Sequence, residues 1–328
     1  MEQRRFSGKG HWYHETQSNH AQSDALPLVP EAANVDDRFL LDLALPDEIV
    51  AACSGWLTPA RALCHQLFPL SIPVNRLHTL SAYDRLSTAL TVAQACGVQR
   101  LCNHYAALLA PLPGPDSSRE SNRRLAQITQ YARQLASSPD VIDDKAQNQL
   151  DEVGLSIYDI VVINQIIGFI GFQARVVAVF QALLGHPVRW LPGHHIQPHT
   201  LPVHARTWVS ILPVVELRYA NAHQLGSLSR WQPEPALQEL TPVLCHEPAL
   251  LDLTGEILIN SREDESPTLL ALSAAVALLT HSPDRFSAAQ FTPLTDEGLP
   301  AVRAINLLTQ SAFGGWLERL SIALGKEE

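Results

Sequence analysis

The side chains best suited to chemistry lie together in residues 83–110 (YDRLSTALTVAQACGVQRLCNHYAALLA). Cys96 and Cys102 are candidate redox nucleophiles, because a thiolate attacks peroxides and disulfides. His104 is a candidate general base that would take the proton from a thiol, and a cation such as Arg85 would lower the pKa of that thiol. The residue types therefore point to thiol chemistry assisted by a histidine.

The spacing of these residues places a limit on that chemistry. Apolar residues recur at helical spacing through 83–110, which predicts one helix. On a continuous helix Cys96 and Cys102 lie about 9 Å apart along the axis and about 120° apart around it, beyond disulfide reach. A helix break at Gly97 would bring them closer; otherwise one cysteine would act alone with His104. The alternative is that both cysteines are small core residues and that His104 is hydrogen-bonded at a subunit contact.

A second helix, predicted over residues 155–185, is apolar on most of its faces. Ser156 is the expected N-cap, with Asp159 completing the cap, and Gly185 is the expected stop. The run is long enough to cross a membrane, but it contains several polar side chains, which favour a buried core helix in a soluble protein. These polar residues are Asn164, Gln165, Gln173, Arg175 and Gln181.

Arg175 must find partners if that helix is buried. One interpretation is an ion pair with an acid such as Asp84 or Asp151 on a neighbouring helix. The other is that Arg175 and its counterpart Arg319 hold an anionic ligand in a cavity between two halves of the chain.

The chain contains an internal repeat at an offset of 144 positions. Residues 150–185 and 294–324 share a Leu, Gly-Leu, Phe, Gly and Arg pattern, and Ser-Pro-Asp recurs at 138–140 and 282–284. The repeat predicts an all-α protein with two helical units in tandem. We expect a first unit over residues 36–190 and a second, degenerate unit over 207–328, which shows no counterpart of the segment at 83–110.

Composition excludes several classes of protein. The 328 residues are 46% apolar, with a formal net charge of −10 and a pI of about 5.7. No basic face suggests a nucleic acid or an anionic membrane as partner. Five cysteines without a CxxC pair fit a reducing cytosol better than a disulfide framework. The N-terminus shows no signal peptide, so we expect a cytoplasmic protein.

Two segments are predicted to lie outside the helical units. Residues 1–35 are polar and predict a flexible N-terminal tail. Residues 191–206 form a linker rich in proline and histidine. Its prolines do not favour the fixed convergent geometry that a histidine zinc site needs, so no metal site is expected.

The GL-x13-F-x5-R helix and the Ser-Pro-Asp element that precedes it resemble the carboxymuconolactone decarboxylase and alkylhydroperoxidase-D-like superfamily, and in particular its members with two units. The resemblance covers most of the chain and implies an all-helical fold, a cytosolic location and a homo-oligomer. With two units in each chain, we expect a trimer with six pseudo-equivalent units.

Active peroxidases of this superfamily carry Cys-x-x-Cys, a histidine four residues after the second cysteine and a glutamate twelve before the first. Aligning His104 with the family histidine puts Gly97 and Arg100 at the cysteine positions and Arg85 at the glutamate position. The histidine therefore matches, whereas the dithiol is missing and the acid is replaced by a base.

Three functions remain open from the sequence. The first is an alkylhydroperoxidase-D-like, peroxidase-related oxidoreductase, with Cys96, Cys102 and His104 as chemical groups and Arg85, Tyr105 and Arg175 binding a small substrate. The second is a non-catalytic oligomeric scaffold or small-molecule binder descended from that family. The third is decarboxylase or lactone chemistry with His104 as general acid–base and no thiol. No sequence motif names a cofactor or a substrate.

Overall fold

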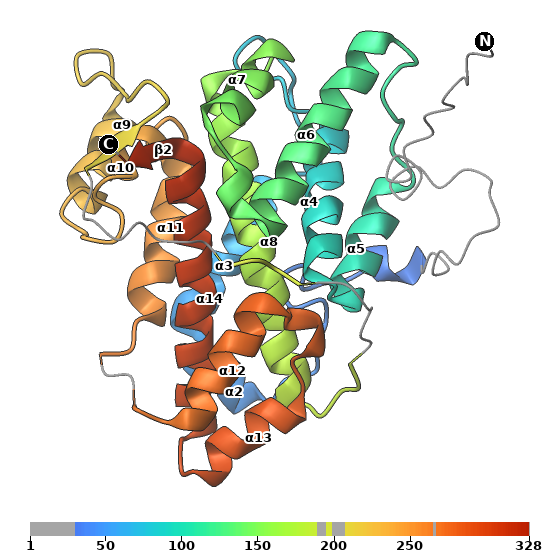
Figure 1. Ribbon diagram of the computed structural model, residues 1–328, viewed down its shortest axis with the longest axis vertical. Helices are drawn as coiled ribbons and strands as arrows, with labels where there is room; N and C mark the ends of the chain where they lie inside the picture. The colour runs from blue at the N-terminus through green and yellow to red at the C-terminus, as the bar shows by residue number, and fades with distance from the viewer. Residues whose placement is uncertain (1–29, 189–194, 199–206, 265–266, 328) are drawn as a thin grey trace, which may run out of the picture.

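A computed structural model describes residues 30–188, 195–198, 207–264 and 267–327 of the chain (Figure 1). The predicted N-terminal tail and the Pro/His-rich linker therefore fall largely outside the described residues. The fold is mainly helical, as expected, and the described residues add one small two-stranded antiparallel sheet. Its strands are β1 (Trp208–Ser210) and β2 (Gly325–Glu327).

Two long helices form the centre of the molecule. They are α8 (Ile157–Leu183) and α14 (Ala301–Leu324), which pack side by side in opposite directions (Figure 1). They approach closely at Gly168, where an added Cβ would lie 1.8 Å from Cδ1 of Trp316. The side chain missing from Gly168 thus makes room for a buried indole.

The start of α8 matches the sequence prediction in detail. The Ser156 hydroxyl accepts a hydrogen bond from the Asp159 amide, and the Asp159 carboxylate accepts one from the Ser156 amide, which together form a capping box. The helix stops at Leu183, just before Gly185, whose φ is +66°. By length and composition α8 could cross a membrane, but 89% of its apolar window is buried inside the structure. This burial favours a core helix over a membrane span.

The remaining elements surround this pair, and their buried apolar side chains join one cluster that runs from Phe39 to Leu324. Helices α4, α5 and α6 lie on one side of α8, while α3 packs against α11 on another. The elements in chain order are η1 (Pro30–Ala33), α2 (Asp47–Ala52), α3 (Ser54–Leu67), α4 (Ala82–Cys96), α5 (Gln99–Leu109), α6 (Arg119–Ser137), η2 (Pro139–Val141), α7 (Asp144–Glu152), α9 (Ala222–Trp231), α10 (Thr241–Leu244), α11 (Pro248–Ser261), α12 (Leu270–His281), η3 (Pro283–Arg285) and α13 (Ala288–Asp296).

Element boundaries recur at the offset seen in the sequence. The helices η3, α13 and α14 each begin 144 residues after η2, α7 and α8, and α12 ends 144 residues after α6. The turns between them match as well: Ser138 and Ser282 have φ of −148° and −149°, and Gly154 and Gly298 have φ of +83° and +90°. In Figure 1, α7 and α13 lie at opposite ends of the α8–α14 pair.

One prediction of a helix boundary was wrong. Residues 83–110 do not form one helix, because Gly97 adopts φ +72°, ends α4 and turns the chain into α5. This left-handed geometry is open to glycine at little steric cost. Pro59 lies within α3, and the interruption between α2 and α3 falls at Cys53.

Candidate functional site

The thiols of Cys96 and Cys102 lie on either side of the Gly97 turn and do not form a disulfide. Cys96 is the last residue of α4 and is 2% exposed, whereas Cys102, in the first turn of α5, is partly buried. Burial raises the pKa of both thiols, that of Cys102 to about 12. Neither cysteine is therefore poised as a thiolate at neutral pH.

Cys96 nevertheless has cationic neighbours. Burial is the main influence on its pKa and raises it, while the Arg175 and Arg319 guanidiniums act in the opposite direction, Arg175 also through a hydrogen bond to the sulfur. The carboxylate of Asp284 raises the pKa further. The arrangement is a buried cluster around one sulfur, at the place where α4 meets the two central helices.

Arg175 does not form the predicted ion pair with Asp84 or Asp151. Its Nη1 donates to the Gly171 carbonyl at 2.8 Å and its Nη2 to the Thr280 carbonyl at 2.7 Å. Asp84 instead closes the N-terminal cap of α4 and lies 3.8 Å from Arg124. Backbone carbonyls, which carry partial rather than full negative charge, thus satisfy this arginine.

His104 lies on α5 and contacts the N-terminal element η1. Its ring Nδ1 is 2.7 Å from the Ala32 carbonyl, and its Nε2 is buried with no hydrogen-bond partner. Burial lowers the pKa of the imidazole. The neighbouring Tyr105 is buried, and its hydroxyl donates to Gln173 Oε1 at 2.8 Å. Both side chains hold α5 to neighbouring elements.

The structure thus separates the residues that the sequence suggested as one site. Cys96 interacts with Arg175, whereas His104 contacts the backbone of η1. Neither residue lines either of the two cavities described below. Arg85, by contrast, lines the first of them.

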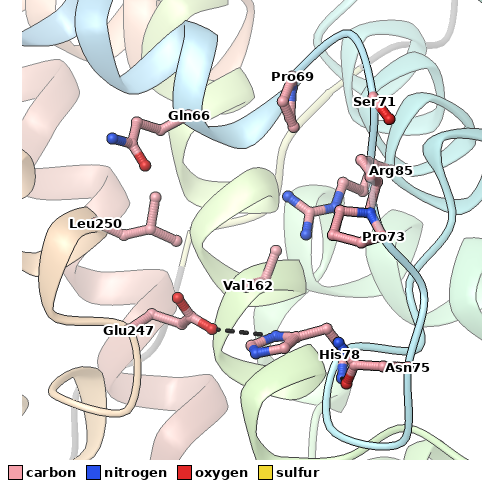
Figure 2. A pocket seen from close by; sticks show the side chains of 11 residues that line it. Gln66, Pro69, Ser71, Pro73, Asn75, His78, Arg85, Val162, Glu247 and Leu250 are labelled. Atoms are coloured by element: carbon pink, nitrogen blue, oxygen red, sulfur yellow. Dashed lines mark hydrogen bonds and ion pairs between the residues drawn. The ribbon is translucent and has the colours of Figure 1, made fainter.

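The first cavity, which we call the Arg85 cavity, has a volume of about 180 Å³ and lies between α3, α4, α8 and α11 (Figure 2). The loop joining α3 to α4 forms one of its walls. Its apolar lining consists of Pro69, Ile72, Pro73, Val162 and Leu250. Polar groups are contributed by Gln66, Ser71, Asn75, His78, Arg85 and Glu247.

The charged groups of the Arg85 cavity face one another across this lining. In Figure 2 the Arg85 guanidinium lies on one side of Val162, and Glu247 and His78 face each other on the opposite side of Val162. Nη1 of Arg85 donates to the Leu67 carbonyl at 3.0 Å, while its Nε has no partner. His78 Nδ1 lies 3.4 Å from Glu247 Oε1.

Burial changes the electrostatics of these groups. It lowers the pKa of the Arg85 guanidinium, against the attraction of Glu247, Asp159 and Asp84. It raises the pKa of the Glu247 carboxyl, while His78 and Arg85 act to lower it. The cavity thus combines a partly buried cation, Arg85, with an acid, Glu247, that is paired with a histidine.

Two consecutive ring contacts support His78, the histidine of this pair. The rings of His78 and Tyr158 have centroids 5.2 Å apart, and Tyr158 and His246 are 5.4 Å apart. His246 Nε2 is 2.8 Å from the Pro213 carbonyl, which orients the last ring. His78 is therefore positioned by a tilted ring contact with Tyr158 as well as by Glu247.

A second cavity, of about 410 Å³, lies between the start of α4 and residues 112–115. Tyr83, Asp84 and prolines line it. Asp84 accepts hydrogen bonds from the amide and hydroxyl of Ser81, so its carboxylate is committed to the helix cap. This cavity offers weaker grounds for recognition than the Arg85 cavity.

Sequence reasoning missed His78 and Glu247. Glu247 is the N-cap residue of α11 and Pro248 is its first residue, so the Glu-Pro pair is a local signal of a helix start. Within the described residues, no group of three or more His, Cys, Asp or Glu side chains could hold a metal ion. No protein-family model and no curated protein sequence matches the chain.

Proposed function

We propose that this protein binds a small carboxylate-bearing molecule in the Arg85 cavity. The observation that carries the proposal is the Arg85 guanidinium, a partly buried cation that lines an apolar-walled cavity and donates through Nη1 to the Leu67 carbonyl. A guanidinium carries five N–H donors, and an incoming carboxylate would accept charge-assisted hydrogen bonds from those that face the cavity. The apolar lining suits a ligand with a short hydrocarbon or ring body.

The proposal corresponds to the non-catalytic, small-molecule-binding descendant of the alkylhydroperoxidase-D-like superfamily. Arg85 occupies the position at which the alignment through His104 places the family glutamate. An acid that relays protons to a thiol is thereby replaced by a cation that attracts anions. The same replacement that removes peroxidase chemistry provides an anion site.

We also propose that the chain is a tandem of two related helical units. The 144-residue recurrence of element boundaries and of turn geometry at Ser138 and Ser282 supports this. Assembly as a cytoplasmic homotrimer remains part of the proposal. Light scattering on the intact chain tests it, and a stable monomer would contradict the trimer.

A second candidate function is thiol oxidoreduction at Cys96. It is favoured by the hydrogen bond from Arg175 and by the nearby charge of Arg319. Both guanidiniums would stabilise a thiolate or an oxidised sulfenate. The burial of Cys96 opposes this function, because the sulfur has almost no contact with solvent.

Isothermal titration calorimetry with benzoate tests the leading proposal, with benzamide as the neutral ligand of the same shape. We expect benzoate to bind and benzamide to bind at least about tenfold more weakly, since a charged hydrogen bond contributes about 1.5–3 kcal/mol. Arg85→Gln should lower benzoate affinity by a similar factor. Equal binding of both ligands, or of benzoate to wild type and Arg85→Gln, would exclude this site.

Two further variants make the test specific. Arg123→Gln removes an exposed arginine that pairs only with Glu152 on the surface, and it should leave benzoate binding unchanged. Arg85→Lys keeps the charge and should retain part of the affinity. Unfolding curves for each variant separate lost binding from lost structure, because Arg85 also holds the Leu67 carbonyl.

A further inference from the structure

The Arg85 cavity already contains a carboxylate before any ligand enters. Glu247 attracts the Arg85 guanidinium electrostatically and lies 3.4 Å from His78 Nδ1. An entering anion must therefore share the cation with an acid of the protein itself. Like charges close together in a partly buried site repel, unless one of them takes up a proton.

Two other carboxylates near the cavity add negative charge to that of Glu247. Asp159 acts on both Arg85 and Glu247, and Asp84 acts on Arg85. Asp159 is itself fixed by hydrogen bonds from Thr79, from the Leu80 amide and from Ser156. Arg124, 3.8 Å from Asp84, is the nearby cation that offsets part of this charge.

Only one of these acids is placed to accept a proton readily. The Asp159 and Asp84 carboxylates already accept backbone and hydroxyl hydrogen bonds from their own helix caps and neighbours. Glu247 has no such cap bonds, although it is the N-cap residue of α11. It faces the imidazole of His78, whose Nδ1 lies 3.4 Å from Glu247 Oε1, so a proton taken up there can be held between the two side chains.

We propose that the Arg85 cavity takes up its anion together with one proton, which is held by the Glu247–His78 pair. The inference rests on the proposed anion binding at Arg85. Charge balances in the step: one carboxylate and one proton enter together, and no bond other than the new N–H or O–H forms. The ligand class thereby becomes a small monocarboxylic acid, bound as an anion beside a protonated pair.

The burial of Glu247 agrees with this assignment, since it already raises the pKa of that carboxyl. A second negative charge beside it raises the pKa of the pair further, so the bound state holds more protons than the free state. By linkage, benzoate affinity should then fall as pH rises, by up to about tenfold per pH unit between about pH 5 and 8.

Calorimetric titration of benzoate at pH 7, in buffers of different ionisation enthalpy, measures the number of protons taken up. We expect about 0.5–1 proton per benzoate bound to wild type, and none for benzamide. Benzoate binding without proton uptake overturns this inference and leaves the proposed function standing. Absence of benzoate binding overturns the proposed function itself.

Variants locate the proton. The double variant Glu247→Gln, His78→Asn should still bind benzoate through Arg85 but take up no proton, and an unchanged proton count would assign the uptake to another group. Should the double variant unfold, Glu247→Gln alone serves, because it keeps the size of the side chain. It should bind benzoate more tightly than wild type at pH 8, and equal or weaker binding there contradicts the competition between the two carboxylates.

Discussion

Arg175 and Arg319 each donate a hydrogen bond to the other half of the molecule at equivalent places. Arg175 Nη2 reaches the Thr280 carbonyl at 2.7 Å, and Arg319 Nη2 reaches the Ala136 carbonyl at 3.4 Å. The two acceptors are 144 residues apart, as are the two arginines. Each Nη1 also donates to the carbonyl four residues earlier in its own helix, at 2.8 Å. The contact is thus reciprocal, as across a two-fold axis.

Aromatic residues between the central helices repeat this reciprocity. The ring centroids of Phe169 and Trp316 lie 5.8 Å apart at 78°, and those of Phe172 and Phe313 lie 5.8 Å apart at 85°. Phe313 is 144 residues after Phe169, and Phe172 is 144 residues before Trp316, so the first contact maps onto the second. The equivalent residues differ at one place, where Trp316 corresponds to Phe172. The aromatic contacts between α8 and α14 are therefore reciprocal at the 144-residue offset.

Replacing Arg175 with methionine should destabilise the protein by about 1–3 kcal/mol, the cost of leaving a buried carbonyl without its donor. The Thr280 carbonyl lies at the end of α12, where helix carbonyls lack partners within the helix. Urea unfolding measures the change, with Arg123→Met as the exposed control expected within about 0.5 kcal/mol of wild type. If Arg175→Met were as stable as wild type, the Thr280 carbonyl would have found another donor.

Gly168→Ala should be among the most destabilising small substitutions in the chain. Its new Cβ would overlap the Trp316 indole, whose ring is 1% exposed and has no free space to enter. We expect a loss of about 1–3 kcal/mol in the free energy of unfolding, as for other overpacked cores.

Gly314→Ala is the matched control for this overlap. Gly314 lies in α14, where an added Cβ meets nothing within 4 Å. Alanine there should stabilise the helix by about 0.5–1 kcal/mol, through its better helix propensity. Similar effects of both alanines in urea unfolding would contradict the close approach of α8 and α14 at Gly168.

The features that sequence predicted best are those encoded locally. Ser156 and Asp159 are three residues apart, and their capping box needs no distant contact. The repeat also predicted equivalent places for Arg175 and Arg319. It did not reveal their partners, because a backbone carbonyl on another helix leaves no mark in the sequence.

The candidate site was harder to predict, because it depends on the packing of distant segments. Glu247 and His78 are separated by more than half of the described chain and meet only because α11 packs beside α3. Cys96 and His104 are close in sequence, yet the turn at Gly97 directs them to different neighbours. The sequence raised a helix break at Gly97 as an alternative, but spacing alone could not show which neighbours the residues on each side of the turn would meet.

Native protein should react slowly with thiol reagents. Burial raises the pKa of all five cysteines, to about 11 for Cys53 and Cys245 and about 12 for Cys64 and Cys102. A time course with iodoacetamide at pH 8, followed by mass spectrometry, should label Cys102 first, because it is the least buried. Every site should react more slowly than free cysteine, and a faster reaction at Cys96 would favour thiol oxidoreduction instead.

The stability of the fold should fall in mild acid because of His104. Its pKa is lowered from 6.5 by burial, so below pH 6.5 the unfolded chain binds a proton that the folded chain does not. The free energy of unfolding therefore decreases as pH falls, by up to about 1.4 kcal/mol per pH unit, until the lower folded pKa is reached. Urea unfolding at pH 7.5 and 5.5 measures the loss.

The variant His104→Gln keeps a donor for the Ala32 carbonyl. Its loss of unfolding free energy between pH 7.5 and 5.5 should be about 1 kcal/mol smaller than that of wild type. The exposed control His65→Gln should behave as wild type. An identical acid response in His104→Gln would place the acid-sensitive group elsewhere.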